Sequence, residues 1–129
     1  MSRPSNPPLP APPQPGWRKT VFAALRTWRA ARDCGASPKH RLHRLLSPFG
    51  HEMLGPMLDS LMALYEQALG RPLVAGATRA LSQDEALLMD LLTGAKRRSA
   101  CIACPEGAGS TFDCALCSAR IMLALRPAG

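Results

Sequence analysis

Hydrophobic residues recur every three to four positions in several segments of this chain, and no segment shows the alternation typical of a half-buried strand. The first such segment covers residues 17–32. Its apolar side consists of Trp17, Val21, Ala24, Leu25, Trp28 and Ala31. The opposite side is basic, so the pattern predicts an amphipathic helix that ends before Gly35. This helix is expected to pack on the protein's own core, and an acidic membrane surface is the alternative.

Two more helices are expected in the middle of the chain. Three leucines predict a short helix that ends near Pro48, after a basic stretch. They are Leu42, Leu45 and Leu46. Residues 56–69 are too apolar for a surface stripe and predict a helix that is buried on more than one side. Pro56 suits its first turn, and Gly70 suits its end.

A capping box marks the start of the next helix. Ser82 and Glu85 have the spacing at which each side chain accepts a hydrogen bond from the other residue's backbone N–H. The leucine stripe that follows is Leu87, Leu88, Leu91 and Leu92. Gly94 is the expected left-handed end of this helix. Asp84 and Glu85 favour the positive end of the helix dipole, so we interpret them as structural rather than catalytic carboxylates.

The last helix is expected to start within 110–113, after a turn-rich loop at 105–110, and to end near Leu125. The chain has 129 residues, which indicates one domain at most. The predicted fold is all-α: a small bundle of four to five helices over 17–129. Seven prolines before position 16 predict a disordered arm at 1–16 that favours polyproline II.

Four cysteines form two C-x-x-C pairs in the last third of the chain. They are Cys101, Cys104, Cys114 and Cys117. Two such pairs can supply the tetrahedral four-sulfur shell of structural zinc, so 101–117 is a candidate zinc site with four cysteine ligands. Two alternatives remain: thiols that are buried as small apolar residues, and thiols that act in redox chemistry or hold an iron–sulfur cluster.

Positive charge is concentrated in the first third of the chain. Residues 1–48 contain nine basic residues and one acidic residue, whereas 49–129 contain seven basic and eight acidic residues. A solubilising basic face is the simplest interpretation, and a nucleic-acid contact is the functional alternative. The candidate phosphate-binding residues are Arg18, Lys19, Arg26, Arg29, Arg41 and Arg44.

Targeting and catalytic signals are missing from the sequence. The first residues are Pro-rich and polar rather than apolar, and no window reaches the length of a membrane span, so we expect a cytoplasmic protein. No G-x-S-x-G, P-loop, G-x-G-x-x-G or H-E-x-x-H motif occurs. These observations argue against an enzyme.

The middle of the chain, roughly 40–92, resembles a family of short, uncharacterised alphaproteobacterial proteins. The similarity rests first on Phe49-Gly50-x-x-Met53-x-x-Pro56-Met57 and the following Leu61-Met62. It continues in Leu81-Ser82-x-Asp84-Glu85-Ala86-x-Leu88. The four cysteines do not belong to the shared pattern. The resemblance implies a small, helical, non-enzymatic, bacterial cytoplasmic protein.

Together these features predict a small interaction or regulatory protein that binds another protein. A nucleic-acid-binding module that uses the basic first third is the first alternative, and a thiol redox sensor is the second. Zinc, held by the four cysteines, is the cofactor that we expect.

Overall fold

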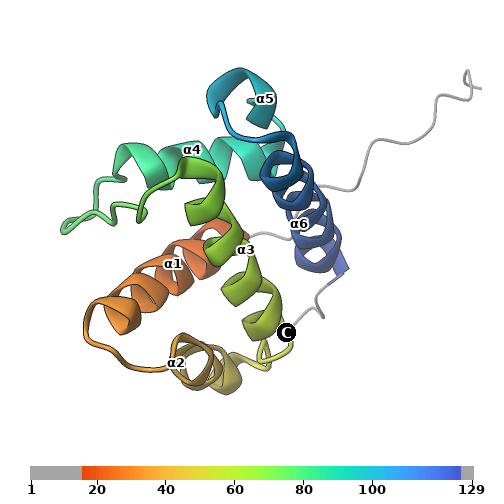
Figure 1. Cartoon of the computed structure of the whole chain (residues 1–129). Coiled ribbons are helices and arrows are strands. Elements are labelled where there is room, and N and C mark those ends of the chain that lie inside the picture. Colours follow the sequence, from red (N-terminus) through yellow and green to blue (C-terminus); the bar gives the residue numbers. More distant parts are fainter. Residues whose placement is uncertain (1–15, 126–129) are drawn as a thin grey trace, which may run out of the picture.

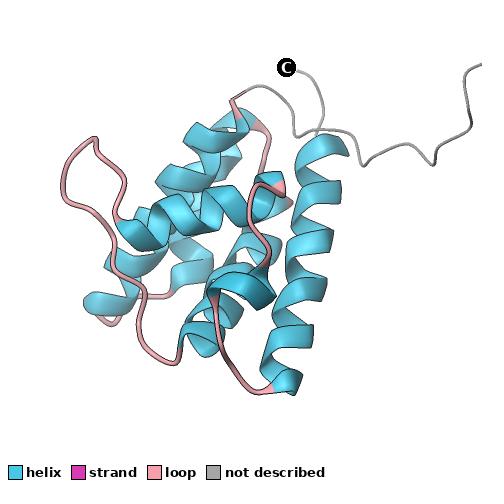
Figure 2. Cartoon of the chain, turned by 90° about the horizontal axis from the view of Figure 1, so that it is seen from above, coloured by secondary structure: helices cyan, strands magenta, loops and turns pink. Residues whose placement is uncertain are grey.

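The computed structural model describes residues 16–125 and is helical throughout, with no strand in that range (Figures 1 and 2). The all-α prediction is therefore confirmed, whereas the predicted Pro-rich arm lies almost wholly outside the described residues. The elements are α1 (Trp17–Asp33), α2 (Pro38–Leu46), the 3-10 turn η1 (Ser47–Phe49), α3 (Leu54–Leu69), α4 (Gln83–Thr93), α5 (Arg98–Cys101) and α6 (Glu106–Leu125). The short α5 was not predicted, so these residues form six α-helices rather than four to five.

Helix α3 is the central element, with α6 along one side and α1 and α2 against the other (Figure 1). The apolar stripes predicted for these helices form the core between them. Its largest fully buried side chains are Trp28, Tyr65 and Phe112. The rings of Tyr65 and Phe112 stack with their centroids 5.4 Å apart, which joins α3 to α6.

The polar atoms of the buried aromatic residues tie the helices to one another. Trp28 Nε1 donates a hydrogen bond of 2.8 Å to the Asp59 carboxylate and so links α1 to α3. The Tyr65 hydroxyl donates a 2.8 Å bond to the backbone carbonyl of Asp84, at the start of α4. Buried aromatic side chains that carry a polar atom are stable in the core because such partners replace water.

Most predicted helix ends are confirmed. Ser82 Oγ accepts a 3.1 Å bond from the Glu85 N–H, and the Glu85 carboxylate accepts a 2.8 Å bond from the Ser82 N–H, which completes the capping box. Gly70 and Gly94 end α3 and α4 in the left-handed conformation, with φ of 74° and 81°. Glycine suits these positions because it has no Cβ to clash at positive φ.

The predicted start of the last helix is wrong. Helix α6 begins at Glu106, directly after Pro105, so the expected loop at 105–110 is its first turns. Gly109 is buried there, and a Cβ on it would lie 2.8 Å from Arg98 Cζ. The Arg98 guanidinium thus rests against the backbone of α6, and its bidentate bonds to Asp113 (3.0 and 3.1 Å) hold it in place. This packing offsets the low helix propensity of glycine.

None of the described helices has the combined length and apolar character required to cross a membrane.

Replacement of Phe112 by alanine is expected to lower the free energy of unfolding by about 3–5 kcal/mol, because it leaves a cavity beside Tyr65. Chemical denaturation monitored by circular dichroism measures the loss. Ile121→Ala, at a half-exposed position (50%) of the same helix, is the control and should change stability by no more than about 0.5 kcal/mol. Equal losses in the two variants would contradict this description of the core.

Candidate functional site

The first turn of α1 presents two exposed cations next to a buried aromatic ring. Trp17 is buried, whereas Arg18 and Lys19 are exposed. The Arg18 guanidinium lies over the Trp17 ring, 5.1 Å from its centroid, which limits the positions that this long side chain samples. Neither cation forms an ion pair with any carboxylate of the part of the chain that the structure describes.

A hollow of about 440 Å³ lies on one side of these cations, between α1 and the α2–η1 segment. We call it the α1–α2 hollow. Its lining consists of Gly16, Lys19, Thr20, Ala23, Leu45, Leu46, Phe49 and His51. Phe49 projects from its edge and is 67% exposed. Because the surface of the hollow is mainly apolar, it suits an apolar side chain with a charged group near Lys19.

His51 closes one end of this hollow. Its backbone N–H donates a 3.1 Å bond to the Leu46 carbonyl, which fixes the residue where η1 leads into α3. Its Nδ1 is buried and has no hydrogen-bond partner among the described residues. His51 therefore brings an unpaired buried nitrogen to the lining of the hollow.

A second hollow, of about 170 Å³, is lined by both cations and lies on the other side of Lys19 from the first. We call it the α1–α4 hollow. Its lining consists of Arg18, Lys19, Phe22, Arg79, Leu81 and Met89. Leu81 is 45% exposed at its rim. Lys19 lines both hollows, so the start of α1 forms a positively charged ridge between two apolar depressions.

Two of the six arginines and lysines predicted to bind phosphate are held by carboxylates and are therefore not free to contact a phosphate group. The Arg26 guanidinium donates to both Glu85 carboxylate oxygens, at 2.9 and 3.0 Å, and Arg29 forms ion pairs with Asp33 and Glu66. The other four are exposed and form no ion pair among the described residues. They are Arg18, Lys19, Arg41 and Arg44.

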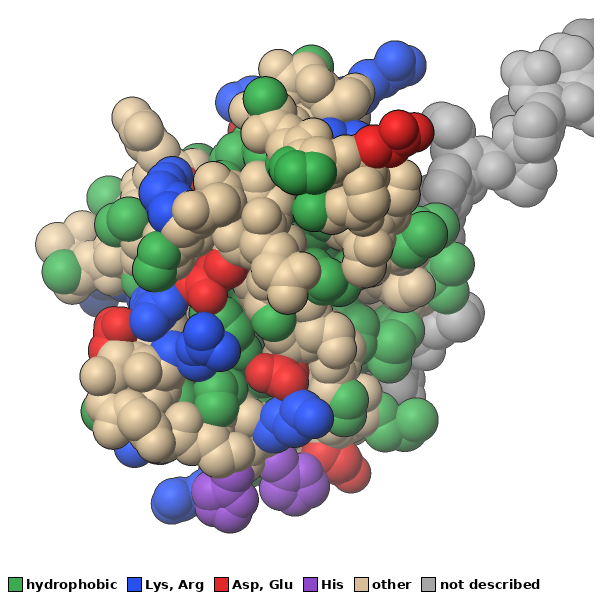
Figure 3. Space-filling model, in the orientation of Figure 1, with side chains coloured by type: hydrophobic (Ala, Val, Ile, Leu, Met, Phe, Trp, Pro, Cys, Tyr) green, Lys and Arg blue, Asp and Glu red, His purple; other side chains and the backbone are tan. Residues whose placement is uncertain are grey.

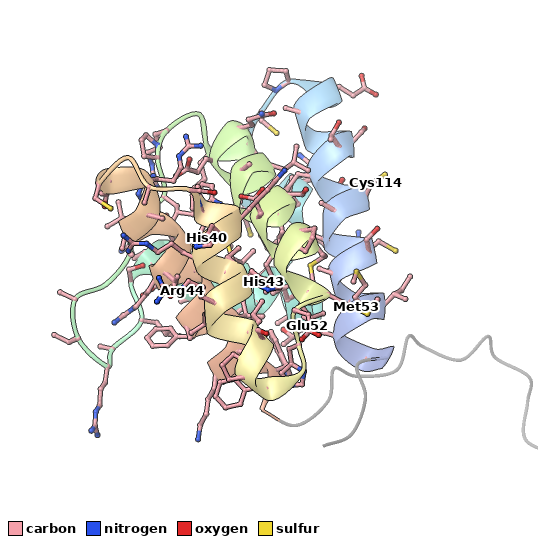
Figure 4. All side chains as sticks on the ribbon, turned by 90° about the horizontal axis from the view of Figure 1, so that it is seen from below. His40, His43, Arg44, Glu52, Met53 and Cys114 are labelled. Atoms are coloured by element: carbon pink, nitrogen blue, oxygen red, sulfur yellow. The ribbon has the colours of Figure 1, made fainter. Side chains whose placement is uncertain are left out.

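Two of these four cations lie on α2 rather than on the ridge. Figure 4 shows His40, His43 and Arg44 projecting from α2 on the side of the molecule seen from below. In Figure 3, basic and acidic side chains lie next to one another on the front of the molecule, and the histidines mark its lower edge. The structure thus divides the basic first third into a paired part and an unpaired part.

The four predicted zinc ligands come from three places in the fold. Cys101 ends α5, Cys104 lies in the following loop with its Sγ 3.7 Å from an Arg98 nitrogen, and Cys114 and Cys117 are on α6. Cys114 lies on the outer side of α6 (Figure 4). In the described range, no three His, Cys, Asp or Glu side chains are grouped to hold a metal ion, so zinc binding stays a prediction.

The thiols are more accessible than core cysteines are. Cys101, Cys114 and Cys117 are exposed, Cys104 is half-buried, and Cys34 is also exposed. The alternative in which these cysteines are core residues is therefore wrong for Cys101, Cys114 and Cys117, whereas Cys104 packs against the core. Accessible thiols are compatible with the redox alternative, which stays a prediction.

Sequence reasoning missed the partners of the two buried carboxylates at the start of α4. Glu85 is completely buried and faces Arg26, while Asp84 accepts bonds of 2.7 and 2.8 Å from Arg71 and 2.7 Å from the Val74 N–H. No local sequence signal connects these partners, because 59 positions separate Arg26 from Glu85. Both carboxylates have structural roles, as the sequence predicted.

These contacts determine how the two carboxyl groups titrate. Arg71 and the Val74 N–H lower the pKa of Asp84 against the opposing effect of burial. Burial raises the pKa of Glu85, but the Arg26 guanidinium and the N–H groups of Ser82 and Gly76 outweigh it and lower the pKa overall. The charged form of each carboxylate therefore stabilises the fold.

No family model, no curated protein and no solved structure matches this chain. The resemblance to the alphaproteobacterial family thus stays a prediction, and function has to be inferred from the surface itself.

The contribution of Asp84 and Glu85 to the free energy of unfolding is expected to be fully present above about pH 5 and to fall as the pH drops below their ordinary pKa values of 3.8 and 4.5. Because both pKa values are lowered in the folded state, the unfolded chain binds more protons in this range. Urea unfolding between pH 3 and pH 7 measures the effect. Glu85→Gln should lower stability at pH 7 and flatten the decline at acid pH, and an unchanged slope would contradict our account.

If the four cysteines hold zinc, elemental analysis of the purified chain should find one zinc per molecule. A thiol reagent should then modify Cys34 at once and the other four cysteines only after a chelator is added. Five immediately reactive thiols without zinc would show that the cysteines do not form this site.

Proposed function

We propose that this chain is a small, non-enzymatic interaction or regulatory protein that binds a partner protein through the start of α1. The observation that carries the proposal is the charged ridge at the start of α1, where Lys19 lies between two apolar hollows and Arg18 lines one of them. Protein-binding surfaces combine apolar depressions at their centre with polar groups around them. The start of α1 combines the same two kinds of surface, but its cations lie between the apolar depressions rather than around them.

Exposed apolar side chains at the rims support the proposal. Phe49 borders the α1–α2 hollow and Leu81 borders the α1–α4 hollow, and both have much of their surface in water. Each could pack on a partner without any change in the core. Single exposed apolar residues are ordinary on a protein surface, so the support comes from their positions at the rims of the two hollows.

The exposed face of α2 supports a second candidate function, nucleic-acid binding. Lys39, Arg41 and Arg44 are exposed there, and none of them forms an ion pair within residues 16–125. Such unpaired cations favour phosphate contacts that weaken steeply with salt. Arg26 and Arg29 do not contribute to this candidate, because their guanidinium groups are held by carboxylates.

Photo-crosslinking in cells that naturally produce the chain tests the first candidate. A benzoylphenylalanine at position 49 should yield an adduct with one protein, identified by mass spectrometry, and Lys19→Glu should abolish it. The same amino acid at position 121, which is exposed on α6, is the matched control. The purified partner should then bind the chain but not the Lys19→Glu variant. No adduct, or the same adducts from both positions, would contradict the proposal, as would catalytic turnover by the isolated chain.

Binding to a short DNA duplex or RNA at about 50 mM salt tests the second candidate, since phosphate contacts are strong in that range. Binding should fall by about 40-fold between 50 and 200 mM salt if the three cations each contact one phosphate, at a slope of about −0.9 per contact. The double variant Arg41→Ala/Arg44→Ala should weaken it, and Arg97→Ala, an exposed arginine at the opposite end of the fold, should not. Negligible affinity at low salt would exclude this candidate.

A further inference from the structure

We propose that the partner binds with a segment that carries acidic residues between two apolar anchor residues. This inference rests on the proposed function and specifies the chemistry of the partner. The apolar anchors enter the α1–α2 and α1–α4 hollows, and the carboxylates between them meet the cations of the ridge.

The shape of the surface indicates two anchors of different size. The α1–α2 hollow, at about 440 Å³, is within the range of ≈300–1,000 Å³ typical of ligand pockets and has room for a large side chain. The α1–α4 hollow, at about 170 Å³, suits a single smaller one. Ala23 leaves space in the first, and Phe22 and Met89 supply apolar surface in the second.

The charge of the surface selects an acidic segment. Arg18, Lys19 and Arg79 line the hollows, and neither lining contains an aspartate or a glutamate. The cation–π contact with Trp17 keeps the Arg18 guanidinium near the ridge before a partner arrives. A partner carboxylate would therefore meet positive charge that no carboxylate in the lining has already neutralised.

Another basic hollow of the fold lacks this property. A hollow of about 390 Å³ near α5 is lined by Lys96, Arg97, Arg98 and Arg120, together with Asp113. There Arg98 pairs with Asp113, Lys96 pairs with Asp90, and Arg120 donates to the backbone carbonyls at the end of α4, while Arg97 forms no ion pair within residues 16–125. Both ends of the molecule therefore carry cations. The start of α1 differs because its cations lie beside apolar hollows whose linings contain no carboxylate.

The spacing of the hollows constrains the partner's sequence. Gly16, Thr20 and Ala23 face one hollow and Phe22 faces the other, in directions roughly 100° apart around a helix that is about 10 Å across, with Lys19 between them. Two residues seven positions apart in a helix are separated by a similar distance, because each residue adds about 1.5 Å. A helical segment with apolar residues at i and i+7 and acidic residues at i+3 and i+4 therefore fits the surface.

The test is a titration of the full-length ¹⁵N-labelled chain with a capped 15-residue peptide, followed by NMR. The peptide carries leucine at i and i+7 and glutamate at i+3 and i+4 on an alanine-rich helix. Amide shifts should change at residues 16–23, 45–51 and 79–81. Two control peptides are used: in one, lysine replaces both glutamates, and in the other, serine replaces both leucines. Each should bind at least tenfold more weakly than the glutamate peptide.

Variants of the chain connect the binding to the ridge. Lys19→Glu should weaken the binding of the glutamate peptide about tenfold or more, because it places a carboxylate against carboxylates. Arg97→Glu changes the net charge equally at an exposed position outside the two hollows and should bind like the unmodified chain. An unchanged spectrum outside the substituted region would show that both variants fold.

Several results would overturn the inference. They are shifts confined to other faces, no shift at millimolar peptide, equal binding of the lysine peptide, and tighter binding of duplex DNA or phosphatidylserine vesicles to the same residues. If crosslinking identifies a partner at position 49 and the glutamate peptide does not bind, the chemistry proposed for the segment is wrong and the proposed function stands. If crosslinking fails while the peptide binds, the proposed function is wrong and the surface chemistry stands.

Discussion

Two buried carboxylates at the start of α4 determine how the loop between α3 and α4 lies on α1. Glu85 faces Arg26 of α1, and Arg26 also donates to the backbone carbonyls of Thr78 and Ala80. A Cβ at Gly76 would lie 2.6 Å from an Arg26 nitrogen. The backbone of the loop therefore packs directly against this guanidinium, and glycine allows the close approach because it has no Cβ. Loss of one partner would leave a buried charge unpaired, which is among the most destabilising changes in a core.

The same pairing shapes the proposed binding surface. The loop that Arg26 holds carries Arg79 and Leu81, which form one wall of the α1–α4 hollow. The Arg26 guanidinium also lies 4.1 Å from the centroid of the Phe22 ring, another wall of that hollow. The shape of the α1–α4 hollow therefore depends on the Arg26–Glu85 ion pair, although neither residue lines the hollow. Acid conditions that weaken the pair are expected to disorder the hollow before the α3–α6 core.

The sequence predicted the parts of the fold that depend on local interactions. Ser82 and Glu85 are three residues apart, and the glycine at the end of α4 follows directly after its helix, so their roles are visible in a short window. The pairing of Arg26 with Glu85 depends on how α1 and α4 pack, and no window of the sequence contains both. The start of α6 was misjudged for a similar reason, because Arg98 packs on Gly109 from another element. A hollow between two helices likewise cannot be predicted from the sequence, because its walls come from residues that only the folded structure brings together.

The chain has sixteen basic and nine acidic residues, so an excess of cations is unavoidable and carries no functional information by itself. The way in which cations and carboxylates are paired over the fold is informative. Glu66, Asp84, Glu85, Asp90 and Asp113 each pair with a cation from another part of the fold or from the following turn. The cations left unpaired around the start of α1 repel one another, which costs stability that one nearby carboxylate would recover. Proteins commonly retain such local costs at sites that another molecule completes, and the apolar hollows beside these cations are consistent with such a molecule being an acidic protein segment.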